Sequence, residues 1–232
     1  HPTLRRQRQM CIRDRNIDTD SVFWPRVMDM NDRSLRSITI GQGAKVNGPI
    51  RRDRFDITAA SEVMAILALS MDYRDLRERL GRVVVASDMD GAPVTADQLN
   101  AGGAMALLLR DAFLPNLVQT LEGDPAFIHC GPFANIAHGN SSVIADSIAL
   151  STCEYVVTEA GFGADMGAEK ALQIKSDSSG VLPDCIVLNV TVRSMKLHGG
   201  AFGAKGSRRP TSEELATETV SYTHLRAHET DT

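Results

Sequence analysis

Hydrophobic and polar positions along the middle of this chain follow a pattern typical of strands separated by helices. Apolar runs rich in β-branched residues predict strands at Arg36–Gly41, Arg82–Ala86, Ala126–Cys130, Glu154–Glu159 and Asp184–Val192. Apolar residues at helical spacing predict helices over about 58–81, 95–113 and 141–151, and from the glycine-rich loop after residue 159 to about 175. Strands that alternate with helices of this length predict an α/β fold, with a mostly parallel sheet flanked by helices.

Local signals refine this pattern in the first half of the chain. Three consecutive valines, Val83 to Val85, are typical of a strand that is buried on both faces. The Asp90-Gly91 dipeptide indicates a turn, and with Ala92–Val94 it predicts a small hairpin. Thr95 and Gln98 have the spacing of a capping box, which predicts the start of the following helix.

The two ends of the chain carry no such pattern. Residues 5–15 and 220–232 match neither the helical nor the strand period, and both strings resemble translated sequencing-adapter DNA. Disordered tails are the alternative interpretation. We therefore expect tails at residues 1–15 and 206–232, and a central α/β region at residues 16–205. The histidines of the C-terminal tail are not interpreted as a metal site.

Composition narrows the class of protein. Hydrophobic residues make up 43% of the chain, charged residues 23%, and the formal net charge is -4. Such values are ordinary for a soluble globular protein and argue against a nucleic-acid-binding surface. No apolar run approaches the roughly 20 residues that a membrane helix needs. The four cysteines are widely spaced, so we expect reduced thiols, no metal site and a cytoplasmic protein.

Three loops that directly follow predicted strands carry the candidate chemistry. In an open α/β sheet, ligands bind beyond the carboxyl ends of the strands. The loops are Gly131–Gly139, entered through His129; Ala160–Gly167, entered through Glu159; and Arg193–Gly200. An aromatic residue in a loop, such as Phe133, suits a flat heterocyclic ligand better than a core. The basic residues of the third loop suit an anion, although such residues are often only solvated.

The glycine-rich second loop also raises the alternative of a dinucleotide site. Its spacing, G-x-G-x-x-x-G, is one residue longer than the dinucleotide-binding fingerprint. The fingerprint also needs an acidic residue at the end of the next strand, whereas Asp184 lies at the start of that strand. A nicotinamide-dependent oxidoreductase is therefore a weak alternative. The motif G-x-x-x-x-G-K-[ST] of P-loop proteins does not occur in the sequence.

Longer strings carry a more specific resemblance. The segments RVMDMNDRSLRSITIG, FDITAASEVMAILALS, NLVQTLEGDPAFIHCGPFANIAHGNSS, VVTEAGFGADMGAEK and TVRSMKLHGG resemble consecutive parts of formate–tetrahydrofolate ligases. The order is collinear, and the resemblance covers nearly all of residues 16–200. It implies an internal fragment of a P-loop-NTPase-like α/β enzyme, without its P-loop and C-terminal part.

The resemblance implies a function in one-carbon metabolism. Such enzymes join formate to tetrahydrofolate through formyl phosphate, consume ATP with Mg²⁺, are activated by monovalent cations and are usually homo-oligomers. It implies catalytic roles for Phe133, Asn135, His138, Arg193 and His198. It implies substrate-binding roles for His129, Glu159, Gly161, Gly163 and Asp165. The fragment alone is expected to be inactive, and the alternative is a non-catalytic folate-binding remnant.

Overall fold

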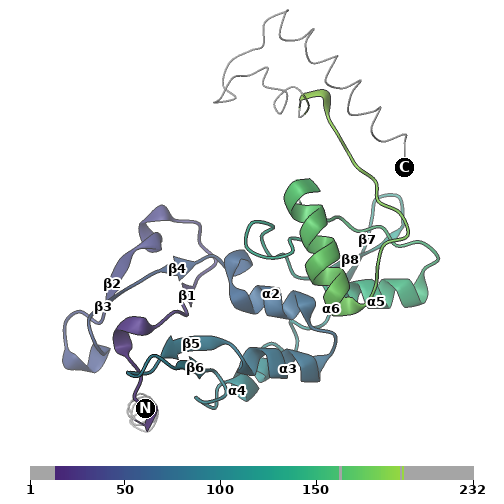
Figure 1. Cartoon of the computed structure of the whole chain (residues 1–232). Coiled ribbons are helices and arrows are strands. Elements are labelled where there is room, and N and C mark those ends of the chain that lie inside the picture. The colour runs from purple at the N-terminus through teal and green to yellow at the C-terminus, as the bar shows by residue number, and fades with distance from the viewer. Residues whose placement is uncertain (1–13, 162–163, 194, 196–232) are drawn as a thin grey trace, which may run out of the picture. The chain divides into compact units, whose positions relative to one another are not determined.

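The computed structural model describes residues 14–161, 164–193 and 195 (Figure 1). The chain divides into two compact units, residues 1–182 and residues 183–232, and each is described by itself. Almost all of the described structure lies in the first unit. The structure confirms an α/β class with short strands and helices. No helix in the described ranges has the length and apolar character to cross a bilayer.

The elements are short and follow one another closely along the chain. The strands are β1 (Arg26–Val27), β2 (Ile38–Ile40), β3 (Arg51–Asp53), β4 (Phe55–Asp56), β5 (Val84–Ser87), β6 (Pro93–Thr95), β7 (Asn116–Gln119) and β8 (Pro125–Ile128). The α-helices are α2 (Glu62–Leu69), α3 (Tyr73–Gly81), α4 (Gly102–Leu108), α5 (Val143–Thr152) and α6 (Asp177–Ser179). The 3-10 helices are η1 (Thr19–Ser21), η2 (Arg33–Arg36), η3 (Lys45–Asn47) and η4 (Thr58–Ala60), and η5 (Ala164–Ala168) and η6 (Ala171–Ser176) are π-helical.

The prediction of one helix over 58–81 is wrong, because the chain turns between two helices there. Ser61 caps α2 by accepting a hydrogen bond from the backbone N–H of Met64, at 3.1 Å. Asp72 caps α3 in the same way, from the N–H of Asp75 at 2.8 Å. A side chain that caps a new helix favours extended backbone at its own position, which ends the preceding helix.

These helices enclose the first hydrophobic core. α3 packs against α4, and α2 packs against both α3 and α5. Their buried side chains are Leu67, Leu76, Leu80, Ala106 and Phe113. The rings of Tyr73 and Phe113 meet edge to face, with centroids 6.3 Å apart. This core supports α5, which begins directly after the loop described below.

The predicted hairpin around Asp90-Gly91 is confirmed. β5 and β6 pair antiparallel, and Val85 and Val94 are buried in a second core. Val83, Val85 and Ala86 are buried, whereas Val84 is exposed, so the predicted burial on both faces is interrupted at Val84. Thr95 and Gln98 do exchange hydrogen bonds as a capping box would, but α4 begins only at Gly102.

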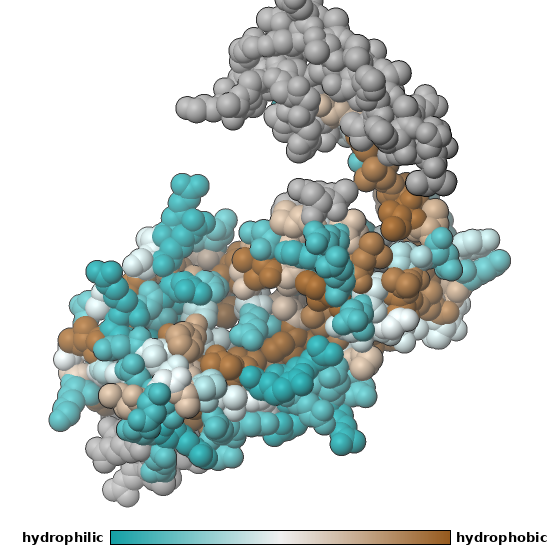
Figure 2. Space-filling model, in the orientation of Figure 1, coloured by the Kyte–Doolittle hydropathy of each residue, from teal (hydrophilic) through white to brown (hydrophobic). Residues whose placement is uncertain are grey.

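The prediction of a mostly parallel sheet is not met by the described strands. They form four two-stranded sheets, of which β1–β4 is parallel and β2–β3, β5–β6 and β7–β8 are antiparallel. The segments predicted as strands at 154–159 and 184–192 form no strand and pair with no described strand. Val157 and Val187 are 97% and 89% exposed, and Figure 2 shows hydrophobic side chains at the surface. The apolar pattern of these two segments suits a buried strand, but a strand also needs a neighbouring strand for its backbone hydrogen bonds.

Candidate functional site

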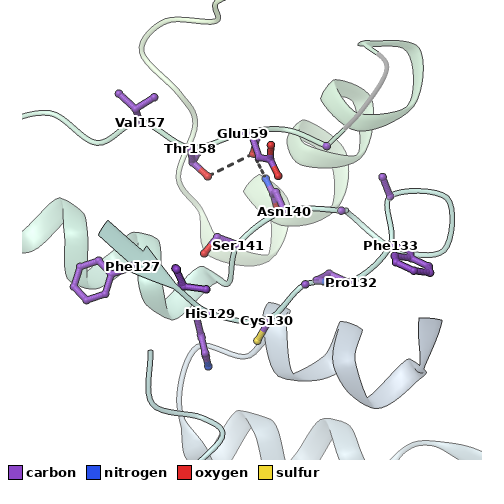
Figure 3. A pocket seen from close by; sticks show the side chains of 15 residues that line it. Phe127, His129, Cys130, Pro132, Phe133, Asn140, Ser141, Val157, Thr158 and Glu159 are labelled. Atoms are coloured by element: carbon purple, nitrogen blue, oxygen red, sulfur yellow. Dashed lines mark hydrogen bonds between the residues drawn. The ribbon is translucent and has the colours of Figure 1, made fainter. Parts of the chain in front are cut away.

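A pocket of about 560 Å³ opens where β8 ends (Figure 3). Two stretches of chain form most of it: the loop from 127 to 141, and the extended segment from 157 to 161. Its lining residues are Phe127, Ile128, His129, Cys130, Gly131, Pro132, Phe133, Ala134, Gly139, Asn140, Ser141, Val157, Thr158, Glu159 and Gly161. Two of the three predicted loops therefore do meet at this pocket, although the segment before the second loop forms no strand.

The turn out of β8 depends on an unusual backbone at Cys130. This residue has a φ of 61°, in the left-handed region that a residue with a side chain rarely adopts. Its thiol packs against the first hydrophobic core, and burial raises the pKa of the thiol to about 12. At neutral pH the thiol therefore stays protonated. It serves packing and is not a nucleophile.

His129 links the loop to α5 and to Ala112, which follows α4 in the chain. Its Nε2 lies 2.8 Å from the carbonyl oxygen of Ala112, and its Nδ1 lies 2.6 Å from Oγ of Ser142. A carbonyl oxygen only accepts, so Nε2 carries the proton and Nδ1 accepts from the Ser142 hydroxyl. That hydroxyl in turn accepts from the N–H of Ala145 and caps α5. With both ring nitrogens engaged, His129 is assigned a structural role rather than the predicted contact with substrate.

The Ser142→Ala variant tests this anchor. It removes the helix cap and leaves Nδ1 of buried His129 unpaired, so the free energy of unfolding should fall by about 2 kcal/mol. Urea denaturation followed by circular dichroism measures the change. Ser151→Ala is the matched control, because Ser151 lies exposed in the same helix and bonds only the carbonyl of Ile148. Equal losses in the two variants would show that the His129–Ser142 contact adds nothing.

Phe133 lies at the rim of the pocket in a loop fixed by backbone hydrogen bonds. Its N–H donates to the carbonyl of Ala59 at 2.9 Å, and its own carbonyl accepts from Ile136 and Ala137 at 3.0 and 2.8 Å. The ring is 43% exposed, and Figure 3 shows it beside Pro132 on the loop. A rigid backbone with a partly exposed ring presents an apolar surface to a ligand at little entropic cost.

Close backbone contacts hold the loop against the segment 157–161. Gly139 and Gly161 both have a φ of +76°, and a Cβ on Gly139 would lie 2.4 Å from the Cβ of Ala134. No larger residue fits at Gly139. Next to it, Nδ2 of Asn140 donates to the carbonyl of Glu159 at 2.8 Å. The loop and the segment therefore form one wall.

His138 does not line the pocket. Its side chain is fully buried, and neither ring nitrogen makes an aligned hydrogen bond to a described group. Burial and, next, the positive charge of Lys175 lower the pKa of His138 to about 4, although backbone groups of Ser141 and Asn140 act in the opposite direction. The imidazole is therefore neutral at physiological pH, and it lies behind the pocket wall rather than in the pocket.

The pocket is mostly apolar and offers hydrogen-bond acceptors. Among the described residues that line it, Glu159 carries the only side chain that is charged at neutral pH. Oδ1 of Asn140 is a buried acceptor without an aligned partner among described groups. Lysine and arginine are absent from this lining set. Such a surface suits an uncharged, flat ligand with N–H donors better than a phosphate.

The structure thus places some of the predicted site residues in the pocket lining and others outside it. Phe133, Glu159 and Gly161 line the pocket, and so does His129, whose ring is engaged elsewhere. Asn135 is exposed on the loop and outside the lining, and Arg193 belongs to the second unit. Gly163, His198 and the side chain of Asp165 lie outside the described residues. The pattern missed Asn140, Lys170 and Lys175, because amide and lysine side chains near helix ends are usually solvated.

Fold and pocket together define an α/β protein with a pocket of the size that small molecules occupy. Comparison with known proteins makes this specific. The family model of formate–tetrahydrofolate ligase matches residues 6–228. The formate–tetrahydrofolate ligase of Roseiflexus sp. (strain RS-1) is 57% identical over 203 residues, covering 88% of this chain and 36% of the relative. That of Desulforamulus reducens is 54% identical over 205 residues, covering 88% and 36%. The mouse mitochondrial monofunctional C1-tetrahydrofolate synthase is 58% identical over 188 residues, covering 80% and 19%.

The chain belongs to the formate–tetrahydrofolate ligase family. It spans about a third of the length of the bacterial relatives named above.

Proposed function

We propose that this chain is the folate-binding part of an ATP-dependent ligase that joins formate to tetrahydrofolate. The pocket at the end of β8 carries the proposal, because its wall bears an aromatic side chain and hydrogen-bond acceptors. The membership of the chain in the ligase family supports it independently. Its volume of about 560 Å³ lies within the range of ordinary small-molecule sites. The product would be 10-formyltetrahydrofolate, with ADP and phosphate.

The pterin ring of tetrahydrofolate matches this pocket. It is flat and bears N–H and amino donors, so it would pack against Phe133 and donate to the carboxylate of Glu159.

The chemistry proposed for the complete protein has two steps. Formate attacks the γ-phosphorus of ATP and releases ADP, which gives formyl phosphate. The N10 amine of tetrahydrofolate then attacks the formyl carbon, the C–O bond to phosphate breaks, and the amine loses a proton. In this scheme Phe133 and Glu159 orient the folate, and the closed wall keeps water from the reactive intermediate.

Charge neutralisation of the intermediate is assigned to residues outside the pocket lining. Arg193 and His198 of the third loop remain the candidates for the anionic groups, and Asn135 for a reacting oxygen. His138 is reassigned from a direct role to one behind the wall, because it is fully buried. Gly163 and Asp165 are proposed to bind substrate, as the resemblance implies.

ATP with Mg²⁺, and a monovalent cation, are proposed for the complete protein. Within the described ranges, no three His, Cys, Asp or Glu side chains converge to hold a metal ion. The sequence also lacks the G-x-x-x-x-G-K-[ST] motif that cradles nucleotide phosphates. The described residues therefore fit neither a metal ion nor a triphosphate, and no residue of this chain is assigned to bind ATP or Mg²⁺. A cytoplasmic homo-oligomer is proposed for the complete protein.

The test uses the complete polypeptide encoded at this locus. Sequencing the genomic DNA upstream of the codon for Asn16 should reveal an in-frame extension that carries the P-loop motif. The purified protein should form 10-formyltetrahydrofolate and sustain ADP release only when ATP, formate and tetrahydrofolate are all present, whereas the 232-residue chain should not. Folate binding without ATP turnover by the complete protein would instead support a non-catalytic folate-binding protein. Binding of NADH would support the oxidoreductase alternative.

Glu159→Gln tests the assignment of the pterin. Replacing the carboxylate by an amide weakens a charge-assisted hydrogen bond, so the KM for tetrahydrofolate should rise by about tenfold or more. The KM for ATP should stay the same. Glu154→Gln is the matched control, because Glu154 lies exposed in the same segment and outside the pocket lining. A Glu159→Gln protein with an unchanged KM for tetrahydrofolate would refute this role.

A further inference from the structure

The segment behind the pocket wall has an unusual helical geometry. η5 (Ala164–Ala168) and η6 (Ala171–Ser176) are both π-helical, which is rare and often found at functional sites. Gly167 of this segment abuts the wall directly, since a Cβ there would lie 2.1 Å from the carbonyl oxygen of Ala160. The π-helical segment is thus in contact with the segment that lines the pocket.

Two lysines of this segment reach into the protein rather than into solvent. Nζ of Lys170 donates to the carbonyl oxygen of Ala134 at 2.6 Å. Nζ of Lys175 lies 2.5 Å from Oδ2 of Asp146, and the Lys175 side chain is only 7% exposed. A buried ammonium is costly, so its placement needs a structural reason.

The π-helical register explains how both lysines face the same way. Side chains five residues apart lie about 140° apart around an α-helix of 3.6 residues per turn. A π-helical turn closes its hydrogen bond between residues i and i+5, which brings such side chains toward one face. Lys170 and Lys175 are five residues apart, and η6 covers the interval between them.

One lysine contacts the loop that bears Phe133, and the other contacts the helix that follows this loop. Ala134 directly follows Phe133, and its carbonyl is the acceptor for Lys170. Asp146 lies in the first turn of α5, just beyond the capping residue Ser142, and it is the partner of Lys175. Between these points lie His138 and Asn140, both buried.

We propose that Lys170 and Lys175 form a two-point clamp, aligned by the π-helical register, that fixes the conformation of the pocket wall from Phe133 to Ser142. They are positioning residues, because neither lines the pocket. Lys170 fixes the position of the Phe133 loop through its hydrogen bond to the Ala134 carbonyl. Lys175 holds α5, and with it the Ser142 end of the loop.

The test is hydrogen exchange measured by NMR in the 232-residue chain. The backbone amides of Phe133, Ile136 and Ala137 report on the loop, because all three donate within it or to Ala59. In Lys170→Met their exchange should become at least tenfold faster. The amide of Leu76, which donates to Asp72 in α3, reports on global unfolding and should keep its protection. Lys45→Met makes the same chemical change at an exposed lysine and should leave all four amides unchanged.

Further variants separate positioning from general stability. Lys170→Arg keeps a cationic donor and should restore most of the protection in the loop. Unchanged exchange of the three loop amides in Lys170→Met would overturn the clamp. If Leu76 also loses protection in Lys170→Met, the size of the two effects decides: a larger acceleration of exchange at the loop amides than at Leu76 supports the clamp, and equal acceleration refutes it.

A second readout uses the complete protein and rests on the proposed function. Lys170→Met should raise the KM for tetrahydrofolate several-fold and leave the KM for ATP unchanged. The exchange experiment needs no ligand, so it still tests the clamp if the protein proves not to use tetrahydrofolate. Faster loop exchange with no folate-dependent activity would support the clamp and refute the proposed substrate.

Discussion

The Asp146→Asn variant should lose about 3 kcal/mol in the free energy of unfolding, the largest loss expected from a single substitution described here. Its partner Lys175 is nearly buried, and the ammonium makes no aligned hydrogen bond to another described group. The contact with Asp146 at 2.5 Å is therefore its main compensation. Removing the carboxylate charge leaves the buried ammonium of Lys175 without its charged partner.

Replacing the lysine of the ion pair should lower the free energy of unfolding by less than replacing the aspartate. Lys175→Met fills a similar volume with an apolar side chain, and the Asp146 side chain is 26% exposed, so water can solvate the carboxylate left behind. We expect a loss of about 1 kcal/mol or less from Lys175→Met. Urea denaturation of both single variants and of the double variant forms a thermodynamic cycle. Asp146→Asn should cost almost nothing in the Lys175→Met background, and additive losses would contradict the ion pair.

Acidification should destabilise the protein through His138. The pKa of its imidazole falls from about 6.5 in the unfolded chain to about 4 in the folded one. Between these values the unfolded chain binds a proton that the folded protein excludes. The stabilisation is therefore complete above pH 6.5 and is lost as the pH falls toward 4, by about 3 kcal/mol in total.

His138→Gln isolates this contribution. The variant has no imidazole at this position, so the fall in stability between pH 7 and pH 5 should be smaller than in the parent chain by about 2 kcal/mol. Urea midpoints at the two pH values measure the difference. In Lys175→Met the pH dependence of stability should also weaken, because the positive charge that helps burial to lower the pKa of His138 is gone. Equal pH dependence in the parent chain and in His138→Gln would show that His138 is not the group that titrates.

Local features of the fold were readable from the sequence because they depend on neighbouring residues. The Asp90-Gly91 hairpin, the helix that begins after Ser142 and the glycine-rich turn at Gly161 each follow from backbone preferences within a few positions. Sheet pairing did not follow in the same way. The segments at 154–159 and 184–192 have the composition of buried strands, but a ladder also requires a partner strand that local sequence does not specify.

The sequence by itself determined the family, the α/β class and the loops that carry Phe133 and Glu159, because long collinear strings and turn residues are local properties. Only the tertiary structure decided which side chains face the pocket. It buried His138, engaged both nitrogens of His129, and brought Lys170 and Lys175 behind the wall. Those outcomes depend on contacts between residues 13 to 36 positions apart, such as Lys170 with Ala134, which no local pattern encodes.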